Sequence, residues 1–229
     1  MRVLLTNDDG IAAPGLQALD DAVRQLGWDP VIVAPAVEQS MCGHRVTTHH
    51  PLKVEQMDSH RHAVHGTPAD CVRLALFALD VKPDLVLSGV NAGGNLGQDI
   101  VISGTVAAAR EAAYHGVRSL ALSHYMIRDL AVDWQRTASW IARILREIHE
   151  AEHPARSFWN INLPHLSPHI RELPQRIHCT PARSPLNVSY AKNEHGYAYT
   201  ASYAERPRDP GSDVDVCFSG HVAVSLLHV

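Results

Sequence analysis

The chain has 229 residues, 45% of them hydrophobic, and a formal net charge of −4, so it can bury a large core but lacks the basic footprint of a protein that binds long nucleic acids. No apolar stretch is long enough to span a membrane, and the first apolar run is too short for a signal peptide. The four cysteines form no Cys-x-x-Cys pair, which excludes a zinc knuckle or a dense disulfide framework and favours a cytoplasmic protein with no membrane partner.

Short apolar runs alternate with helically spaced apolar residues over most of the chain. Continuous apolar runs are typical of strands covered on both faces of a parallel sheet. A capping-box pattern of Thr67, Pro68 and Asp70 opens one of the helices. Strands are predicted at 3–5, 31–34, 85–87, 120–122 and 158–162, and helices at 16–26, 68–78, 105–114 and 134–148. The alternation predicts an α/β fold, with a doubly wound, mostly parallel, Rossmann-like sheet in a catalytic domain of residues 1–175.

The character of the chain changes in residues 176–229. Prolines recur there, four tyrosines lie between residues 190 and 203, and no long helical period is present. The segment therefore predicts an extended arm or β-hairpin. Tyrosines favour a contact surface between subunits, because an aromatic ring with a polar tip suits an interface. A hairpin packed on its own subunit remains the alternative.

Four polar side chains fall where ligands bind in open α/β sheets, beyond the carboxyl ends of the strands. They are Asp8, Asp9, Ser40 and Asn91. Two adjacent carboxylates repel each other unless a cation neutralises them. Oxygen ligands without His or Cys suit magnesium or manganese, so one divalent cation per subunit is expected. The alternative for residues 7–10 is a turn that caps the following helix.

A glycine-rich loop at residues 89–97, followed by Ser103, Gly104 and Thr105 at a helix start, predicts an anion site. Glycines let backbone N–H groups approach phosphate oxygens, and a helix N-terminus adds partial positive charge. Plain turn chemistry is the alternative for the glycines. The histidines between residues 44 and 65 could form another metal site, but their spacing is not that of a zinc site.

Four motifs in order resemble the SurE (stationary-phase survival protein E) family of metal-dependent 5′/3′-nucleotidases. They lie at residues 5–15, 34–40, 66–72 and 88–108, and Met41-Cys42 stands where the family often has glycine. The resemblance implies that Asp8, Asp9, Ser40 and Asn91 bind the metal, and that Asn95, Ser103, Gly104 and Thr105 line the phosphate pocket. It also implies hydrolysis of 5′- and 3′-nucleoside monophosphates, sometimes of polyphosphate, by homodimers or homotetramers that exchange C-terminal elements.

We expect water activated by the cation to attack phosphorus, with Asp9 or Asp8 as the catalytic carboxylate. A haloacid-dehalogenase-like phosphatase would need a nucleophilic aspartate two residues before an acid aspartate, and Asn7 occupies that position before Asp9. A non-catalytic nucleotide sensor is the remaining alternative.

Overall fold

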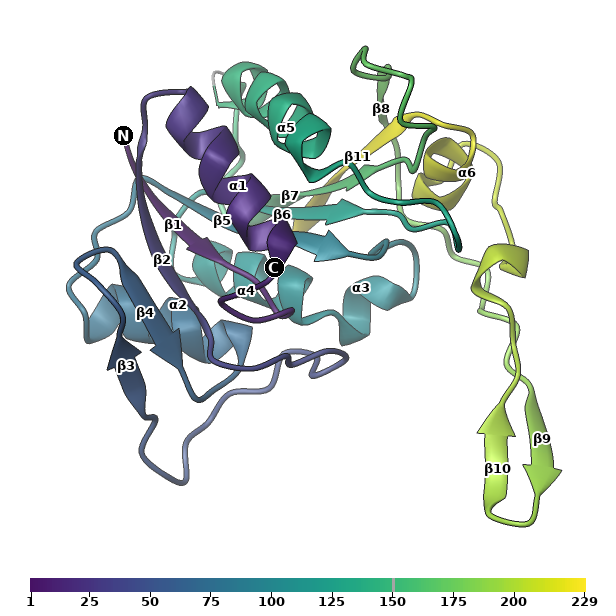
Figure 1. The fold of residues 1–229 in the computed structure, drawn as a ribbon, viewed down its shortest axis with the longest axis horizontal. Helices are drawn as coiled ribbons and strands as arrows, with labels where there is room; N and C mark the ends of the chain where they lie inside the picture. Colours follow the sequence, from purple (N-terminus) through teal and green to yellow (C-terminus); the bar gives the residue numbers. More distant parts are fainter. Residues whose placement is uncertain (150) are drawn as a thin grey trace.

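A nine-stranded sheet with helices on both faces forms the centre of the computed structural model, which describes residues 1–149 and 151–229 (Figure 1). Its strands are β1 (Arg2–Thr6), β2 (Asp29–Pro35), β3 (Val54–Gln56), β4 (Arg61–Val64), β5 (Leu85–Ala92), β6 (Ser119–His124), β7 (Ser157–Leu163), β8 (Arg176–His178) and β11 (Val222–His228). They lie in the order β3-β4-β2-β1-β5-β6-β7-β11-β8, and the run from β4 to β7 is parallel throughout. The predicted doubly wound, mostly parallel α/β sheet is confirmed.

Helices cover the sheet in two layers. On one face lie α1 (Pro14–Gln25) and α5 (Trp134–Ile148), and on the other α2 (Pro68–Phe77) and α4 (Gly104–Tyr114). The short helices are α3 (Asp99–Ile102), α6 (Asp213–Phe218) and the 3₁₀ turn η1 (Tyr203–Glu205). The capping box of α2 forms as expected: Asp70 N donates to Thr67 Oγ1 at 3.2 Å, and Thr67 N donates to Asp70 Oδ2 at 2.9 Å. No helix in the described ranges has the length and apolar character needed to cross a bilayer.

The core explains why the central strands are apolar at every position. In β1, Val3 and Leu5 pack with α1 and α5, whereas Leu4 packs with α2 and α4. Successive side chains of a strand point to opposite faces, so a strand covered on both sides buries each of them.

The largest change at the end of a predicted strand is in β5, which continues to Ala92 and so includes Gly89, a residue assigned to a loop from the sequence. A Cβ on Gly89 would lie 2.2 Å from the carbonyl oxygen of Leu122 in β6. The pairing of β5 with β6 also shifts register between Ser88 and Asn91. Gly89 is therefore required by the close approach of a neighbouring backbone, and not by a turn.

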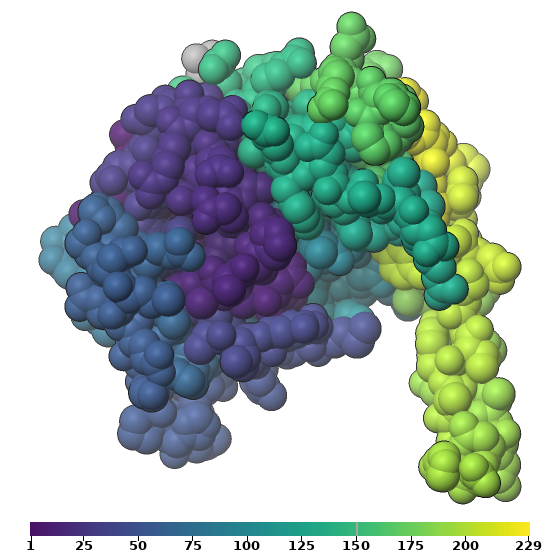
Figure 2. All heavy atoms as spheres, in the orientation of Figure 1, coloured from purple at the N-terminus to yellow at the C-terminus, as the bar shows by residue number. Residues whose placement is uncertain are grey.

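The segment 176–229 divides between the sheet and a projecting hairpin. β11 runs antiparallel to β7 and parallel to β8, so both C-terminal strands extend the sheet. Between them, β9 (Tyr190–Asn193) and β10 (Gly196–Tyr199) form an antiparallel hairpin that extends away from the body (Figures 1 and 2). Its role in subunit contact, and the domain division at residue 175, stay predictions.

Candidate functional site

The carboxyl edge of the sheet gathers the loops that follow β1, β2 and β5. Asp8 and Asp9 come directly after β1, Ser40 lies in the loop after β2, and Asn91 is near the end of β5. Gln39 N donates to the Asp8 carbonyl oxygen at 2.7 Å, and Ala92 N donates to Asp9 Oδ2 at 3.1 Å. The residue before Ser40 and the residue after Asn91 therefore each contact the aspartate pair directly.

Asp8 is buried between its own loop and the first turn of α4. The Thr105 hydroxyl donates to Asp8 Oδ1. A Cβ on Gly104 would lie 2.8 Å from Asp8 Cβ and 2.9 Å from Cys42 Sγ, so only glycine lets the helix start this close to the carboxylate. Burial raises the pKa of Asp8 to about 6; the Thr105 hydroxyl opposes this rise, and the neighbouring Asp9 adds to it.

The pKa of Asp9 is raised as well. Burial is the main cause, the hydrogen bond from Ala92 N opposes it, and the nearby Glu38 carboxylate adds to the rise. Two adjacent carboxylates whose ionised forms are both disfavoured form a site that a cation would stabilise, because positive charge offsets the burial and the repulsion together.

The donor set fits a hard divalent cation. The hydrogen bonds to Asp8 Oδ1 and Asp9 Oδ2 leave the other carboxylate oxygen of each residue available as a ligand. Asn91 Nδ2 donates to the Gly93 carbonyl at 2.9 Å, which leaves Asn91 Oδ1 available. The Ser40 hydroxyl donates to Glu38 Oε1 at 2.5 Å and keeps acceptor capacity. Oxygen ligands of this kind suit magnesium or manganese.

No group of three His, Cys, Asp or Glu side chains suitable for a metal occurs among the described residues. A cation at the Asp8–Asp9 pair would therefore rely on amide and hydroxyl oxygens and on water to complete its coordination. That requirement agrees with the preference of magnesium for one or two carboxylates plus water and phosphate.

The N-terminus of α4 presents backbone N–H groups beside the aspartate pair. Ser103 caps the helix by accepting a hydrogen bond from Val106 N at 3.1 Å. The N–H groups of Gly104 and Thr105 lie in the first helical turn, where no intrahelical acceptor exists. The Thr105 N–H also interacts with the Asp8 carboxylate and acts to lower its pKa. With the partial positive charge of the helix end, the N–H groups of this first turn form a suitable environment for an anion.

Asn95 is buried and fixed by strands β6 and β7. Its Nδ2 donates to Ser123 Oγ at 2.8 Å, and its backbone N donates to Asn162 Oδ1 at 2.8 Å. Asn160 and Asn162 return hydrogen bonds to the Asn95 carbonyl at 2.9 and 3.1 Å. We did not predict from the sequence that these residues contact Asn95. Their polar side chains inside otherwise apolar strands could have indicated it. The sequence also did not predict that Glu38 and Cys42, two residues on either side of Ser40, lie close to the aspartate pair.

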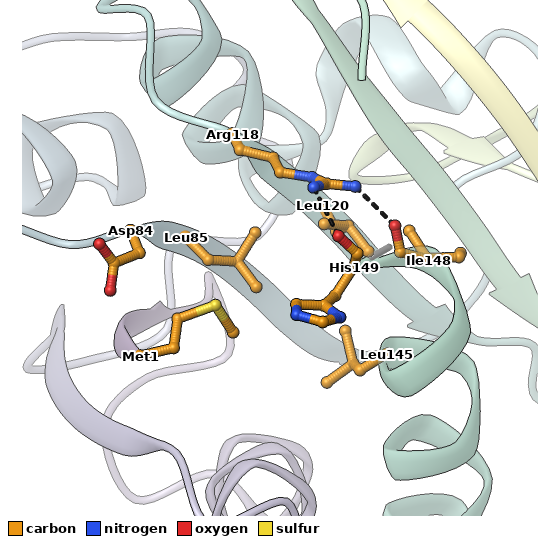
Figure 3. A pocket seen from close by; sticks show the side chains of 8 residues that line it. All are labelled: Met1, Asp84, Leu85, Arg118, Leu120, Leu145, Ile148 and His149. Atoms are coloured by element: carbon orange, nitrogen blue, oxygen red, sulfur yellow. Dashed lines mark hydrogen bonds between the residues drawn. The ribbon is translucent and has the colours of Figure 1, made fainter. Parts of the chain in front are cut away.

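A separate small hollow of about 80 Å³ lies at the opposite edge of the sheet (Figure 3). It is bordered by Met1, Leu85 and Leu120, at the amino ends of β1, β5 and β6. There Arg118 donates to the carbonyls of Ile148 at 2.5 Å and His149 at 2.7 Å, and so closes the end of α5. Its mainly aliphatic border and this helix cap identify a structural feature of the fold.

The chain is similar to proteins of one family over most of its length. The family model described as "Survival protein SurE" matches residues 3–183. A putative 5′-nucleotidase of Nostoc sp. is 46% identical, and the alignment covers all of both chains. The 5′-nucleotidase SurE of Erythrobacter litoralis is 39% identical over all of this chain and 94% of the relative. The crystal structure of the SurE protein from Aquifex aeolicus superposes with a TM-score of 0.86 at 33% identity, covering 100% of this chain and 93% of that one.

Proposed function

The chain belongs to the SurE family, and from this membership we propose that it is a metal-dependent phosphatase that hydrolyses nucleoside monophosphates to nucleoside and phosphate. The observation that carries the proposal is the placement of the buried Asp8 carboxylate against the first turn of α4. This arrangement puts a cation site and an anion site side by side, as phosphoryl transfer requires.

In this proposal, separate residues are assigned to the metal and to the phosphate. Asp8, Asp9, Ser40 and Asn91 hold one divalent cation, magnesium or manganese. When bound, the cation supplies positive charge that offsets phosphate charge and lowers the pKa of a water molecule. The N–H groups of Gly104 and Thr105 orient the phosphate, with Ser103 and Asn95 shaping the pocket around it.

Asp9 is the better candidate for orienting the attacking water or accepting its proton. It is only partly buried, whereas Asp8 is buried and already bound by the Thr105 hydroxyl. Asn7 is no substitute for a nucleophilic aspartate, since it is fully buried and its amide donates to the Gly10 carbonyl at 2.9 Å. Direct attack by water therefore agrees best with the residues present.

We also propose a homodimer or homotetramer that contacts through the β9–β10 hairpin. Tyr190, Tyr197 and Tyr199 on this hairpin are all more than half exposed. A lone two-stranded hairpin is at best marginally stable in water, so packing against another subunit would stabilise it. The base of the arm is fixed, because Arg206 donates to both oxygens of Asp99 at 2.6 and 3.1 Å.

The cytoplasm is the proposed location, since all four cysteines are free and two of them are buried, which suits a reducing compartment. Hydrolysis of 3′-monophosphates and of polyphosphate belongs to the same proposal, because the site described contacts only the phosphoryl group.

Phosphate release tests the proposal directly. The purified full chain is given 5′- and 3′-nucleoside monophosphates, inorganic tripolyphosphate and a chromogenic phosphomonoester, each with magnesium, with manganese or with a chelator. We expect metal-dependent release from nucleoside monophosphates. Tight nucleotide binding without any phosphate release would instead indicate the non-catalytic sensor.

A further inference from the structure

A polar groove of about 510 Å³ opens between the loop after β2 and the start of α2. Its lining includes basic residues, Arg45, His49, His50 and His65, and the hydroxyl residue Thr48. No carboxylate and no Phe, Tyr or Trp lines it in the part of the chain that the structure describes. The groove therefore has the donors and positive charge that suit an anion, and it lacks an aromatic platform for stacking a nucleobase.

Gln39 lines the groove and also contacts the candidate active site. Gln39 N donates to the Asp8 carbonyl at 2.7 Å, and its side-chain oxygen accepts from the Arg45 guanidinium at 3.1 Å. Two hydrogen bonds, both made by Gln39, thus connect Asp8 with the Arg45 guanidinium. A ligand whose terminal phosphate lies at Asp8 can extend toward Arg45.

The loop that forms the groove is anchored at three points close together in sequence. His44 Nε2 bonds to Glu111 Oε2 at 2.6 Å, and Thr67 Oγ1 donates to the Arg45 carbonyl at 2.6 Å. Thr47 donates twice to the buried Asp70 carboxylate, from N at 2.8 Å and from Oγ1 at 2.7 Å.

Glu111 holds the loop of the groove through its hydrogen bond with His44. Burial acts to raise its pKa, but hydrogen bonds from His44, Arg73 and His115 bring the pKa down to about 2. The carboxylate is therefore ionised over the working pH range and can hold its basic partners. A binding surface that is already ordered loses less entropy when a ligand binds.

The charges that face the groove are predominantly positive. Arg45 supplies a guanidinium group to the lining, and the three imidazoles add ring nitrogens. His65 bonds to Glu55 Oε1 at 2.8 Å, and Lys53 bonds to the same oxygen at 2.7 Å, so that carboxylate is already neutralised outside the groove. Asp70 is bound by Thr47 and Thr67 N and lies buried beneath the surface.

We propose that this groove is a second phosphate subsite, which binds a further phosphate group of a substrate whose terminal phosphoryl group is hydrolysed at Asp8 and Asp9. The new substrate class is a nucleoside 3′,5′-bisphosphate, and the polyphosphate already named in the proposed function would bind through the same groove. This inference rests on the proposed phosphatase activity. It adds that the enzyme prefers substrates with more than one phosphate.

The test compares substrates that differ in phosphate number. Wild type, Arg45→Ala, Arg45→Lys and the control Arg143→Ala, an exposed position on α5, are assayed with a nucleoside monophosphate, a nucleoside 3′,5′-bisphosphate and inorganic tripolyphosphate. We expect Arg45→Ala to raise KM for the compounds with several phosphates about tenfold more than KM for the monophosphate. Arg45→Lys should recover part of the difference, and Arg143→Ala should show none.

If KM rises only for the bisphosphate, or only for tripolyphosphate, the groove binds the second phosphate of that compound. An equal change in KM for all three substrates, or no change for any, overturns the proposal. If wild type hydrolyses none of them, the proposed activity fails, and calorimetric titration with tripolyphosphate still tests the groove. Weaker tripolyphosphate binding to Arg45→Ala than to Arg143→Ala supports the subsite, whereas equal binding refutes it.

Discussion

Asp8→Asn separates the proposed metal-binding role of Asp8 from its effect on folding. Burial raises the pKa of Asp8 from 3.8 to about 6, so the folded state disfavours its ionised form. Each pKa unit corresponds to about 1.4 kcal/mol, which gives a destabilisation of about 3 kcal/mol when the carboxylate is fully ionised. Because the pKa of this acid is raised on folding, the destabilisation is absent below pH 4, grows as the pH rises through 6, and is complete above it.

Asparagine has nearly the same volume and can still accept the hydrogen bond from Thr105, but it carries no charge. The stronger bond of Thr105 to the charged form is already part of the net pKa shift, so its loss needs no separate correction. In a chelator at pH 8, Asp8→Asn should therefore be more stable than wild type by about 3 kcal/mol. At pH 4 this advantage should disappear. Turnover should be lost at every pH, because the variant lacks a negative charge that the cation needs.

Urea denaturation at pH 4 and pH 8 measures these differences, with Asp129→Asn as a control at an exposed position. Magnesium should then stabilise wild type, by about 2.7 kcal/mol at one hundred times its dissociation constant, and should leave Asp8→Asn unchanged. The reasoning is refuted if Asp8→Asn is less stable than wild type in chelator at pH 8, or if it retains full activity at saturating magnesium.

Three further outcomes follow from the same site and from the arm. Gly104→Ala should lower stability by about 1–3 kcal/mol and reduce kcat/KM at least tenfold, because its Cβ would overlap Asp8 and Cys42; a variant as stable and active as wild type would contradict the packing described. Replacing residues 189–200 by a short glycine-serine linker should lower the particle mass measured by light scattering, and an unchanged mass would assign assembly elsewhere. Hydrolysis of a chiral, oxygen-isotope-labelled phosphorothioate should invert configuration at phosphorus, whereas retention would indicate a covalent intermediate.

The sequence was sufficient for the central sheet because its signals there are local. The apolar run of β1 and the capping box at Thr67 each depend on residues close together in the chain, and both occur where predicted. The aspartate pair could likewise be placed at a strand end, since the carboxyl ends of parallel strands share one edge.

Non-local contacts account for what the sequence did not reveal. Gly89 was assigned to a loop because glycine usually marks a turn, whereas the structure needs it to fit beside the Leu122 carbonyl of another strand. The pairing of β8 with β11 joins segments far apart in the chain, and β8 is too short to be recognised by periodicity. The polar partners of Asn95 and the anchors of the Arg45 loop also depend on tertiary contacts that no spacing encodes.

The position of the arm between β8 and β11 has a consequence for how relatives of this chain diverge. Both ends of the arm are held to the body of the protein. Leu186 N donates to Gln98 Oε1 at 2.9 Å at the first end, and the Arg206–Asp99 ion pair holds the second. Closing a flexible loop costs only about 0.6 kcal/mol more for each doubling of its length. Insertions and deletions between residues 187 and 202 should therefore survive selection on stability, while the carboxyl edge of the sheet tolerates almost none. If the hairpin forms the proposed subunit contact, lineages can change that contact without altering the site at the carboxyl edge of the sheet.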